Sequence, residues 1–339
     1  MKLIRLGIDL AKNVFELCGV NDQEQVVYRK SVRRRVLMQE LSKLEPCVIG
    51  MEACGGAHYW ARRLRALGHD VRLMAPQFVR PYRKSDKNDR NDAEAICEAV
   101  NRPSMRYVPI KDAQSQAVLS VHRIREQQMK QRTALVNQLR GLLAEFGVVV
   151  NKGVGHLRRA LPEILEDAEN ALPDLMRELL AEQYEVLRQL DERIAAQDQR
   201  IKRLAQQSEP ARRLMTMGGI GPLTATAMVA SVGQCETFKS GRQFSAWLGL
   251  VPRHYGSGGY NRLGQISKRG DRYLRTLLVH GARSVMYTID RRTDRKSEWA
   301  RGVKARRGQN RAIVALAAKH ARIIWALLSS GETYQPSAV

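Results

Sequence analysis

The spacing of hydrophobic positions changes part-way along the chain. Over residues 1–76, short apolar runs, several alternating with polar residues, predict strands separated by turns or short helices. Strands are expected at 3–10, 14–20, 25–32, 47–52 and 70–75, and helices at 36–44 and 58–67. The first three strands follow one another directly, and the later ones alternate with helices. This order predicts a mixed α/β sheet with helices packed against it.

From residue 91 onward the period becomes helical. Residues 113–146 predict one long helix with a basic surround, and a glycine-bearing break follows at 151–155. A second long helix is predicted at 173–207, with apolar residues recurring in steps of four and three, as in a coiled-coil seam. The seam consists of Met176, Leu180, Gln183, Leu187, Leu190, Ile194, Gln197, Ile201 and Leu204. An intramolecular helical hairpin and a dimerisation coiled coil both fit this pattern.

The two predicted helical regions differ in net charge. The chain carries 57 Lys+Arg and 34 Asp+Glu, a net charge of +23, and residues 241–328 hold 19 Lys+Arg against 4 Asp+Glu, which is +15. Residues 156–207 are acidic, with 11 Asp+Glu against 8 Lys+Arg. We therefore expect three domains: 1–150 (α/β, with the long basic helix), 156–208 (coiled-coil segment) and 210–330 (mainly helical). The basic third domain indicates a polyanionic partner.

Several protein classes are excluded by composition. The apolar runs are interrupted by Lys, Arg or His before membrane-spanning length, so no membrane span is expected. The N-terminus carries charge within its apolar stretch and lacks a small-residue cleavage site, which argues against a signal peptide. The five cysteines include no Cys-x-x-Cys pair, which argues against disulfides and zinc knuckles. The sequence therefore predicts a cytoplasmic protein.

Carboxylates occur where apolar strands end. Asp9 lies inside the first apolar strand and Glu52 at the end of another, positions where an unpaired charge is costly. Asp89 and Asp92 open a helix three residues apart, so they share one face. If these segments meet, four carboxylates converge on a site suited to Mg²⁺ or Mn²⁺. The alternative for Asp89 or Asp92 is a helix N-cap, and Asp86 also precedes the pair.

A glycine-rich turn, GGIGPLTA at 218–225, lies between apolar helical segments. It resembles a helix-hairpin-helix turn, in which free backbone N–H groups near Gly219 and Gly221 could hold a phosphate. An ordinary tight connection between two helices fits the turn equally well.

A second glycine-rich segment, 252–271, contains a serine in a cationic setting. Ser257 is flanked by glycines, which would let a DNA backbone approach, and its hydroxyl could attack a phosphodiester. His254 is a weaker guess for a helper base, and Ser267 is a second candidate serine. A flexible loop whose hydroxyl only contacts phosphate is the simpler alternative. The cations predicted to contact nucleic acid are Arg262, Lys268, Arg269, Arg272 and Arg275.

Five motifs in order carry a family resemblance: GIDLAKNVF, GMEACGGAHYW, KNDRNDAEAI, GGIGPLTA and LVPRHYGSGGYNRLGQISKRGDRYLR. Together they resemble the DEDD transposases of the insertion-sequence one-ten family, in particular its eleven-eleven group, over nearly the whole chain. The resemblance implies a RuvC-like domain of RNase H fold, a helical coiled-coil insertion and a mainly helical C-terminal transposase domain.

The resemblance also implies a mechanism. Asp9, Glu52, Asp89 and Asp92 fall on the DEDD positions and would hold Mg²⁺, and Ser257 falls on the serine that forms a covalent phosphoserine intermediate with DNA. The implied partners are donor and target DNA, a structured non-coding bridge RNA encoded by the element, and further copies of the chain in a dimer or tetramer. The implied function is RNA-guided DNA recombination that mobilises the element.

Three other functions remain open at this point. A site-specific DNA invertase of the same superfamily shares these motifs. A RuvC-like junction nuclease would need the carboxylates but not Ser257. A basic protein that packages RNA or DNA would explain the charge of +23 but not Asp9 and Glu52 inside apolar strands.

Overall fold

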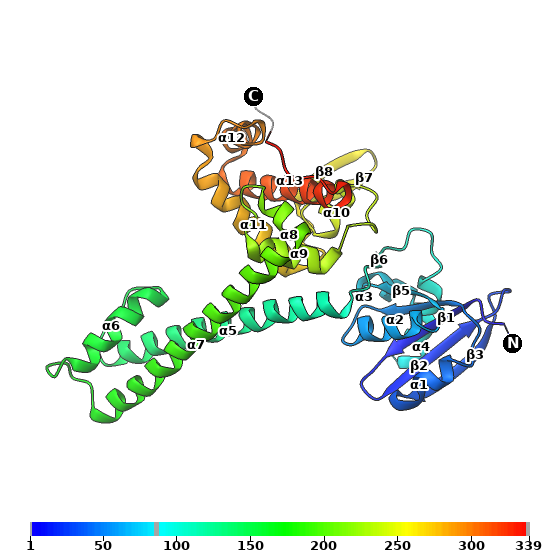
Figure 1. Ribbon diagram of the computed structural model, residues 1–339, viewed down its shortest axis with the longest axis horizontal. Coiled ribbons are helices and arrows are strands. Elements are labelled where there is room, and N and C mark those ends of the chain that lie inside the picture. Colours follow the sequence, from blue (N-terminus) through cyan, green and yellow to red (C-terminus); the bar gives the residue numbers. More distant parts are fainter. Residues whose placement is uncertain (1, 85–87, 337–339) are drawn as a thin grey trace. The chain divides into compact units, whose positions relative to one another are not determined.

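The computed structural model describes residues 2–84 and 88–336, and Asp86 lies outside these ranges. The chain divides into two compact units: unit 1 comprises residues 1–116 with 231–239, and unit 2 comprises 117–230 with 240–339 (Figure 1). This division places the long basic helix with the helices that follow it, whereas the sequence led us to group it with the α/β domain. The three predicted domains stay a prediction.

Within the described residues of unit 1, a six-stranded mixed sheet has the order β3-β2-β1-β4-β5-β6. Its strands are β1 (Arg5–Leu10), β2 (Val14–Val20), β3 (Val26–Arg33), β4 (Val48–Glu52), β5 (Asp70–Met74) and β6 (Tyr107–Val108). β1, β4 and β5 are parallel, and β2, β3 and β6 join by antiparallel pairing. The mixed sheet predicted from the apolar runs is confirmed, with most strand ends within one or two residues.

Helices cover both faces of this sheet. The helical segments are η1 (Arg34–Val36), α1 (Leu37–Leu41), α2 (Ala57–Arg65), α3 (Pro76–Val79), η2 (Arg80–Tyr82) and α4 (Asp89–Ala99). α1 and α2 share the larger apolar core with the sheet, whereas α4 packs against β1, β2 and β4 on the other face. Gly7 makes this packing possible, because a Cβ there would lie 2.2 Å from the Ala93 carbonyl oxygen. α4 is therefore held directly against the strand that carries Asp9.

Three long helices come next: α5 (Ala113–Glu145), which begins in unit 1 and continues into unit 2, then α6 (Val154–Glu166) and α7 (Asp174–Gln207) of unit 2. Leu139 of α5, Leu161 of α6 and Leu180 of α7 belong to one buried cluster, so the seam of α7 packs within the chain. Arg132 and Asp191 form an ion pair of 2.8 Å between α5 and α7. This arrangement is the intramolecular hairpin that the heptad pattern allowed. α6 was not predicted: residues 156–172 were included in the coiled-coil segment without a helix of their own.

In the rest of unit 2, the strands and helices of the described residues are one β-hairpin and otherwise helices. Its elements are α8 (Glu209–Met215), α9 (Pro222–Val232), α10 (Gly241–Trp247), β7 (Pro252–Ser257), β8 (Tyr260–Ile266), α11 (Arg272–Tyr287), η3 (Ile289–Arg291), α12 (Arg295–Arg307) and α13 (Gln309–Ser330). Among the described residues, α13 alone has the length and hydropathy of a membrane span, yet half of its apolar window is buried. It packs against α10, α11 and α12 as a core helix.

Candidate active site

The register of the sheet brings the first two predicted carboxylates to neighbouring strand ends. β1 and β4 are parallel, and Gly7 lies opposite Gly50. Asp9 and Glu52 each come two residues later, so both belong to the face that α4 covers. Because parallel strands end at the same edge, the two carboxylates are carried to one place in the fold. The strand period alone predicted Asp9 inside one apolar strand and Glu52 at the end of another, and left open whether the two strands are adjacent.

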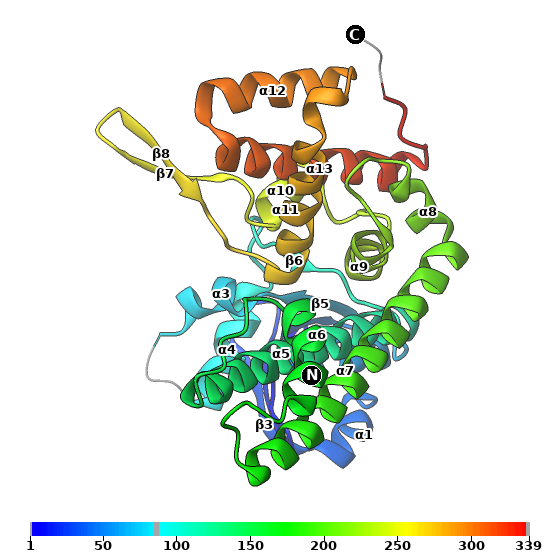
Figure 2. The ribbon, with the colours of Figure 1, turned by 90° about the vertical axis from the view of Figure 1, so that its left-hand side faces the viewer.

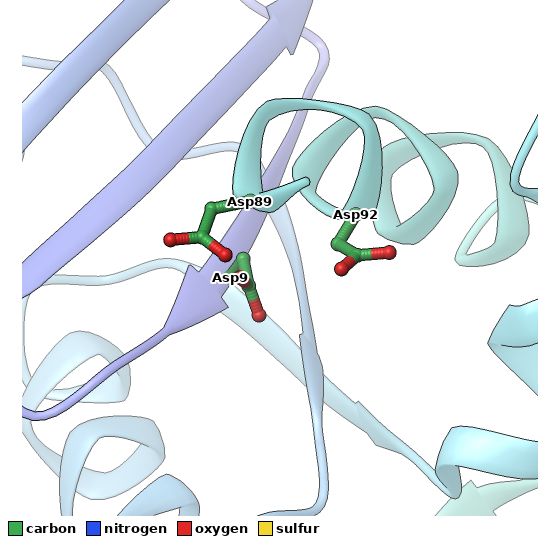
Figure 3. Close-up of side chains that lie close together, drawn as sticks. All are labelled: Asp9, Asp89 and Asp92. Atoms are coloured by element: carbon green, nitrogen blue, oxygen red, sulfur yellow. The ribbon is translucent and has the colours of Figure 1, made fainter. Parts of the chain in front are cut away.

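The first turn of α4 supplies the other two carboxylates (Figure 3). Asn88 is the N-cap, its side-chain oxygen accepting from the backbone N–H of Asn91 at 2.8 Å. The alternative interpretation of Asp89 or Asp92 as the N-cap is therefore wrong. Both aspartates lie in the first turn of α4, at the positive end of the helix dipole. Each of Asp9, Asp89 and Asp92 offers a carboxylate oxygen within 4.8 Å of the others.

Electrostatic repulsion between these groups is visible at Asp9. Burial is the largest cause that raises the pKa of Asp9, and together with the charges of Asp89, Asp92 and Glu52 it brings that pKa from 3.8 to about 6. Glu52 thus acts on Asp9 electrostatically, although it lies outside the compact group of three. Carboxylates held together against their mutual repulsion are suited to a hard divalent cation, which prefers oxygen ligands.

A cation near the group was missed from the sequence. Arg83, at the end of η2, forms an ion pair of 3.3 Å with Asp92 and donates a hydrogen bond to it. Nothing in the spacing of Arg83 distinguishes it from the other basic residues around it. Its position follows from the chain returning from β5 to α4, which only the folded sheet determines.

The segment with Ser257 forms a β-hairpin, although we predicted a glycine-rich loop. β7 and β8 pair with Ser257 opposite Tyr260, and the ribbon projects from the helices of unit 2 (Figure 2). Gly258 and Gly259 both have positive φ, 56° and 85°, as a two-residue type I′ turn requires. Position 257 therefore lies at the tip of the hairpin, not in an irregular loop. Almost every residue of β8 is exposed.

The other predicted residues of the hairpin region have distinct surroundings. Ser267 ends the ribbon, and its hydroxyl oxygen accepts a hydrogen bond of 3.4 Å from the backbone N–H of Arg269. His254 and Arg262 are exposed on β7 and β8. Lys268, beyond β8, has a positive φ of 54°. The ribbon thus carries basic side chains on an open surface.

The predicted contacts near α9 and α11 divide into exposed and internally bonded groups. Arg272, in the first turn of α11, is exposed, whereas Arg275 donates from Nη1 to the Leu248 carbonyl oxygen at 3.1 Å. Gly219 packs closely on α11, since a Cβ there would lie 2.7 Å from the Gly281 carbonyl oxygen. Gly221 directly precedes α9 in open space. Close helix packing accounts for Gly219 without a phosphate.

Two family models match this chain, one in its N-terminal part and one in its C-terminal part. A transposase model of the DEDD IS110 type matches residues 6–147, and the model described as "Transposase IS116/IS110/IS902 family" matches residues 211–298. The chain belongs to this transposase family. The transposase is 52% identical to the "Probable family 20 transposase" of Pseudomonas aeruginosa over 99% of its own length and all of that protein.

Two further relatives name the insertion sequences they serve. The "Transposase for insertion sequence element IS1111A" of Coxiella burnetii is 44% identical over 98% of this chain and 92% of its own length. The "Transposase for insertion sequence element IS1328" of Yersinia enterocolitica is 39% identical over 97% of this chain and 98% of its own. The family resemblance stated from the five motifs is confirmed. The transposase is thus a DNA-cutting and rejoining enzyme, which excludes a purely packaging protein.

Proposed function

We propose that this transposase cuts and rejoins donor and target DNA through a covalent serine–DNA intermediate, with a divalent metal held by carboxylates and with guidance by an element-encoded bridge RNA. The observation that carries the proposal is the group of Asp9, Asp89 and Asp92, whose oxygens lie within 4.8 Å of one another at strand and helix ends. The mixed sheet, with three antiparallel strands followed by parallel ones, supports the RuvC-like RNase H fold expected for such a domain.

The donor set fits Mg²⁺ or Mn²⁺, because all of its ligands are carboxylate oxygens. Asp9, Asp89 and Asp92 would hold the ion, with Glu52 completing the set from β4. A divalent cation there would polarise phosphate oxygens and favour deprotonation of an attacking hydroxyl. Arg83 balances one negative charge through Asp92. The contact at Gly7 fixes α4 against β1. Asp89 and Asp92 on α4 are therefore held in a defined position relative to Asp9 on β1.

Ser257 is the proposed nucleophile. Its hydroxyl oxygen bonds to the phosphorus as its proton leaves, and the bond from phosphorus to one neighbouring sugar oxygen breaks, which frees a DNA hydroxyl. The hydroxyl of a new partner strand then attacks the same phosphorus and restores the serine. The bond energy is kept in the ester, so rejoining needs no ATP. Positions 254 and 257 are an odd number apart and belong to opposite faces of a regular strand, which weakens the case for His254 as base.

The proposed partners are inferred from the net charge and from exposed apolar side chains. The net charge of +15 in residues 241–328 supports binding of DNA and RNA. Leu175, Leu179 and Val186 are 67%, 46% and 42% exposed on α7 and lie four and seven residues apart. This stripe lies outside the intramolecular seam and supports a homo-oligomer. A monomeric mass at all concentrations in light scattering would contradict the oligomer.

The decisive experiment compares two serines. Wild-type protein, Ser257→Ala and Ser267→Ala are incubated with Mg²⁺, the element's ends and its non-coding RNA, then denatured. We expect covalent protein–DNA adducts and recombination from the wild type and from Ser267→Ala, and neither from Ser257→Ala. An adduct formed by Ser257→Ala, or no adduct from a recombining wild type, refutes the serine mechanism.

A further inference from the structure

A cavity of about 700 Å³ in unit 1 lies at the same edge of the sheet as the carboxylates, against the α2 side. It is formed by the turn after β1, the end of β3 and one side of α2. Its lining consists of Asn13, Val14, Arg33, Arg34, Arg35, Met38, Tyr59, Trp60 and Arg63. The volume falls within the range of pockets that bind small ligands. Among the described residues, the lining contains four arginines and no carboxylate.

Two aromatic rings, Tyr59 and Trp60, line this cavity together with the Arg34 guanidinium. The Trp60 ring meets Phe15 edge-on at 5.3 Å and Tyr59 edge-on at 5.1 Å. The guanidinium of Arg34 lies over Trp60 at 5.2 Å and donates to the Lys12 carbonyl oxygen at 3.3 Å. Phe15 and Trp60 are buried, at 0% and 5% exposure. These contacts hold Arg34 in a defined orientation before any ligand arrives.

The rim, by contrast, is open. Tyr59 is 42% exposed, and the Arg63 guanidinium lies 5.9 Å from its ring centre. Arg33 and Arg35 are exposed on the other side of the cavity. Throughout residues 2–84 and 88–336, none of the four arginines has a carboxylate within ion-pair distance. The cavity therefore combines unneutralised positive charge with a partly exposed tyrosine ring.

The combination of arginines and aromatic rings indicates which class of ligand fits the cavity. A partner with phosphates alone would be served by the arginines without the rings, and an apolar partner would not balance four positive charges. An unpaired nucleotide carries both a planar base, which stacks on aromatic rings and guanidinium planes, and a phosphate, which arginine binds bidentately. In a regular duplex the bases are stacked on one another and cannot enter such a cavity.

We propose that the cavity formed by Arg33, Arg34, Arg35, Tyr59, Trp60 and Arg63 binds an unpaired nucleotide of a single-stranded RNA or DNA segment. The base stacks at Tyr59, and the adjoining phosphates contact the arginines of the rim. The site is separate from the carboxylate group and does not depend on the serine chemistry.

The test uses the full-length protein without Mg²⁺, so that it does not depend on strand transfer. Binding of labelled eight-nucleotide rU and dT strands and of a blunt DNA duplex is measured at about 0.3 M salt, where non-specific phosphate binding is weak. We expect Tyr59→Ala to weaken single-strand binding about tenfold, as loss of one stacking contact does, with little effect on the duplex. Arg35→Gln and Arg63→Gln should each lower the salt slope by about 0.7.

The matched control is Arg102→Gln. Arg102 also lies over a tyrosine ring, Tyr82 at 5.3 Å, but Glu98 neutralises it at 2.5 Å. We expect this variant to bind like the wild type. Photo-crosslinks from halogenated uracil should map to Tyr59 or Trp60, and tighter binding of rU than of dT would assign the segment to RNA. Unchanged single-strand binding in both Tyr59→Ala and Arg63→Gln, or crosslinks only in unit 2, would overturn the proposal.

Discussion

Replacing Asp9 by Asn tests whether the three aspartates repel one another in the free protein and bind a divalent cation. Asn has nearly the same shape but no charge, so it imitates protonated Asp9. Burial and the nearby carboxylates raise the pKa of Asp9 from 3.8 to about 6, close to two units. At neutral pH this corresponds to at most about 3 kcal/mol against the ionised form. Because Asp9 is partly exposed, solvent screening reduces the value to about 1–2 kcal/mol.

The sign of the pH dependence follows from the raised pKa. Folded Asp9 binds its proton more tightly than the unfolded chain does, so its stabilising contribution is complete below about pH 4 and is lost as the pH rises through about 6. Asp9→Asn keeps that contribution at every pH. Without metal, the variant should therefore match the wild type at pH 4 and exceed its melting temperature by about 4–8 °C at pH 7.5.

With Mg²⁺ present, we expect the wild type to have the higher melting temperature of the two proteins. A ligand at a hundred times its Kd stabilises the folded state by about 2.7 kcal/mol, and this gain needs the Asp9 carboxylate. The assay is thermal unfolding with EDTA and with Mg²⁺, with hydrogen exchange in α4 assigning the transition to unit 1. Glu16→Gln is the control, because Glu16 lies opposite Asp9 in the strand register, whereas burial, Asp89, Asp92 and Glu52 are what raise the pKa of Asp9. If Asp9→Asn is the less stable protein in EDTA at pH 7.5, the repulsion argument is wrong.

Three further predictions address the basic surface, the sheet–helix contact and a buried histidine. The triple variant Lys268→Gln, Arg269→Gln, Arg272→Gln should lower the salt slope of duplex binding by up to about 2.7, at about 0.9 for each lost phosphate contact; Arg188→Gln, on the acidic α7, should not change it. Gly7→Ala should destabilise unit 1 by about 3 kcal/mol in denaturant unfolding, because its Cβ would collide with α4 backbone, whereas Gly55→Ala, with open space around it, should change stability by under about 0.5 kcal/mol. Burial lowers the pKa of His122 from 6.5 to about 4, so its stabilising contribution is complete above about pH 6.5 and is lost as the pH falls to about 4, up to about 3 kcal/mol; a His122→Gln variant with the same acid sensitivity in thermal unfolding would contradict this.

The local pattern of apolar and polar residues determined most of the secondary structure of this protein. Strands and helices follow from the period of apolar residues, because burial on one face of an element requires that period. The sequence also placed Asp9 inside the first apolar strand, Glu52 at the end of another, and Asp89 and Asp92 on one helical turn. It did not separate the N-cap from the proposed metal ligands, since Asn88, Asp89 and Asp92 are all good caps. The tip of the β7–β8 hairpin was missed because a pair of glycines fits a loop as well as a type I′ turn.

The tertiary structure decided which of these residues meet. Asp9 and Asp89 are eighty residues apart, and their oxygens approach only because Gly7 lets α4 lie directly on β1. Sheet register then put Glu52 near them but outside the compact group. The arginine and aromatic cavity likewise joins residues 33–35 to 59–63, two segments with no shared pattern. Periodicity reports which face of an element is buried, whereas a site depends on what that face packs against, and that is settled only when distant elements pack together.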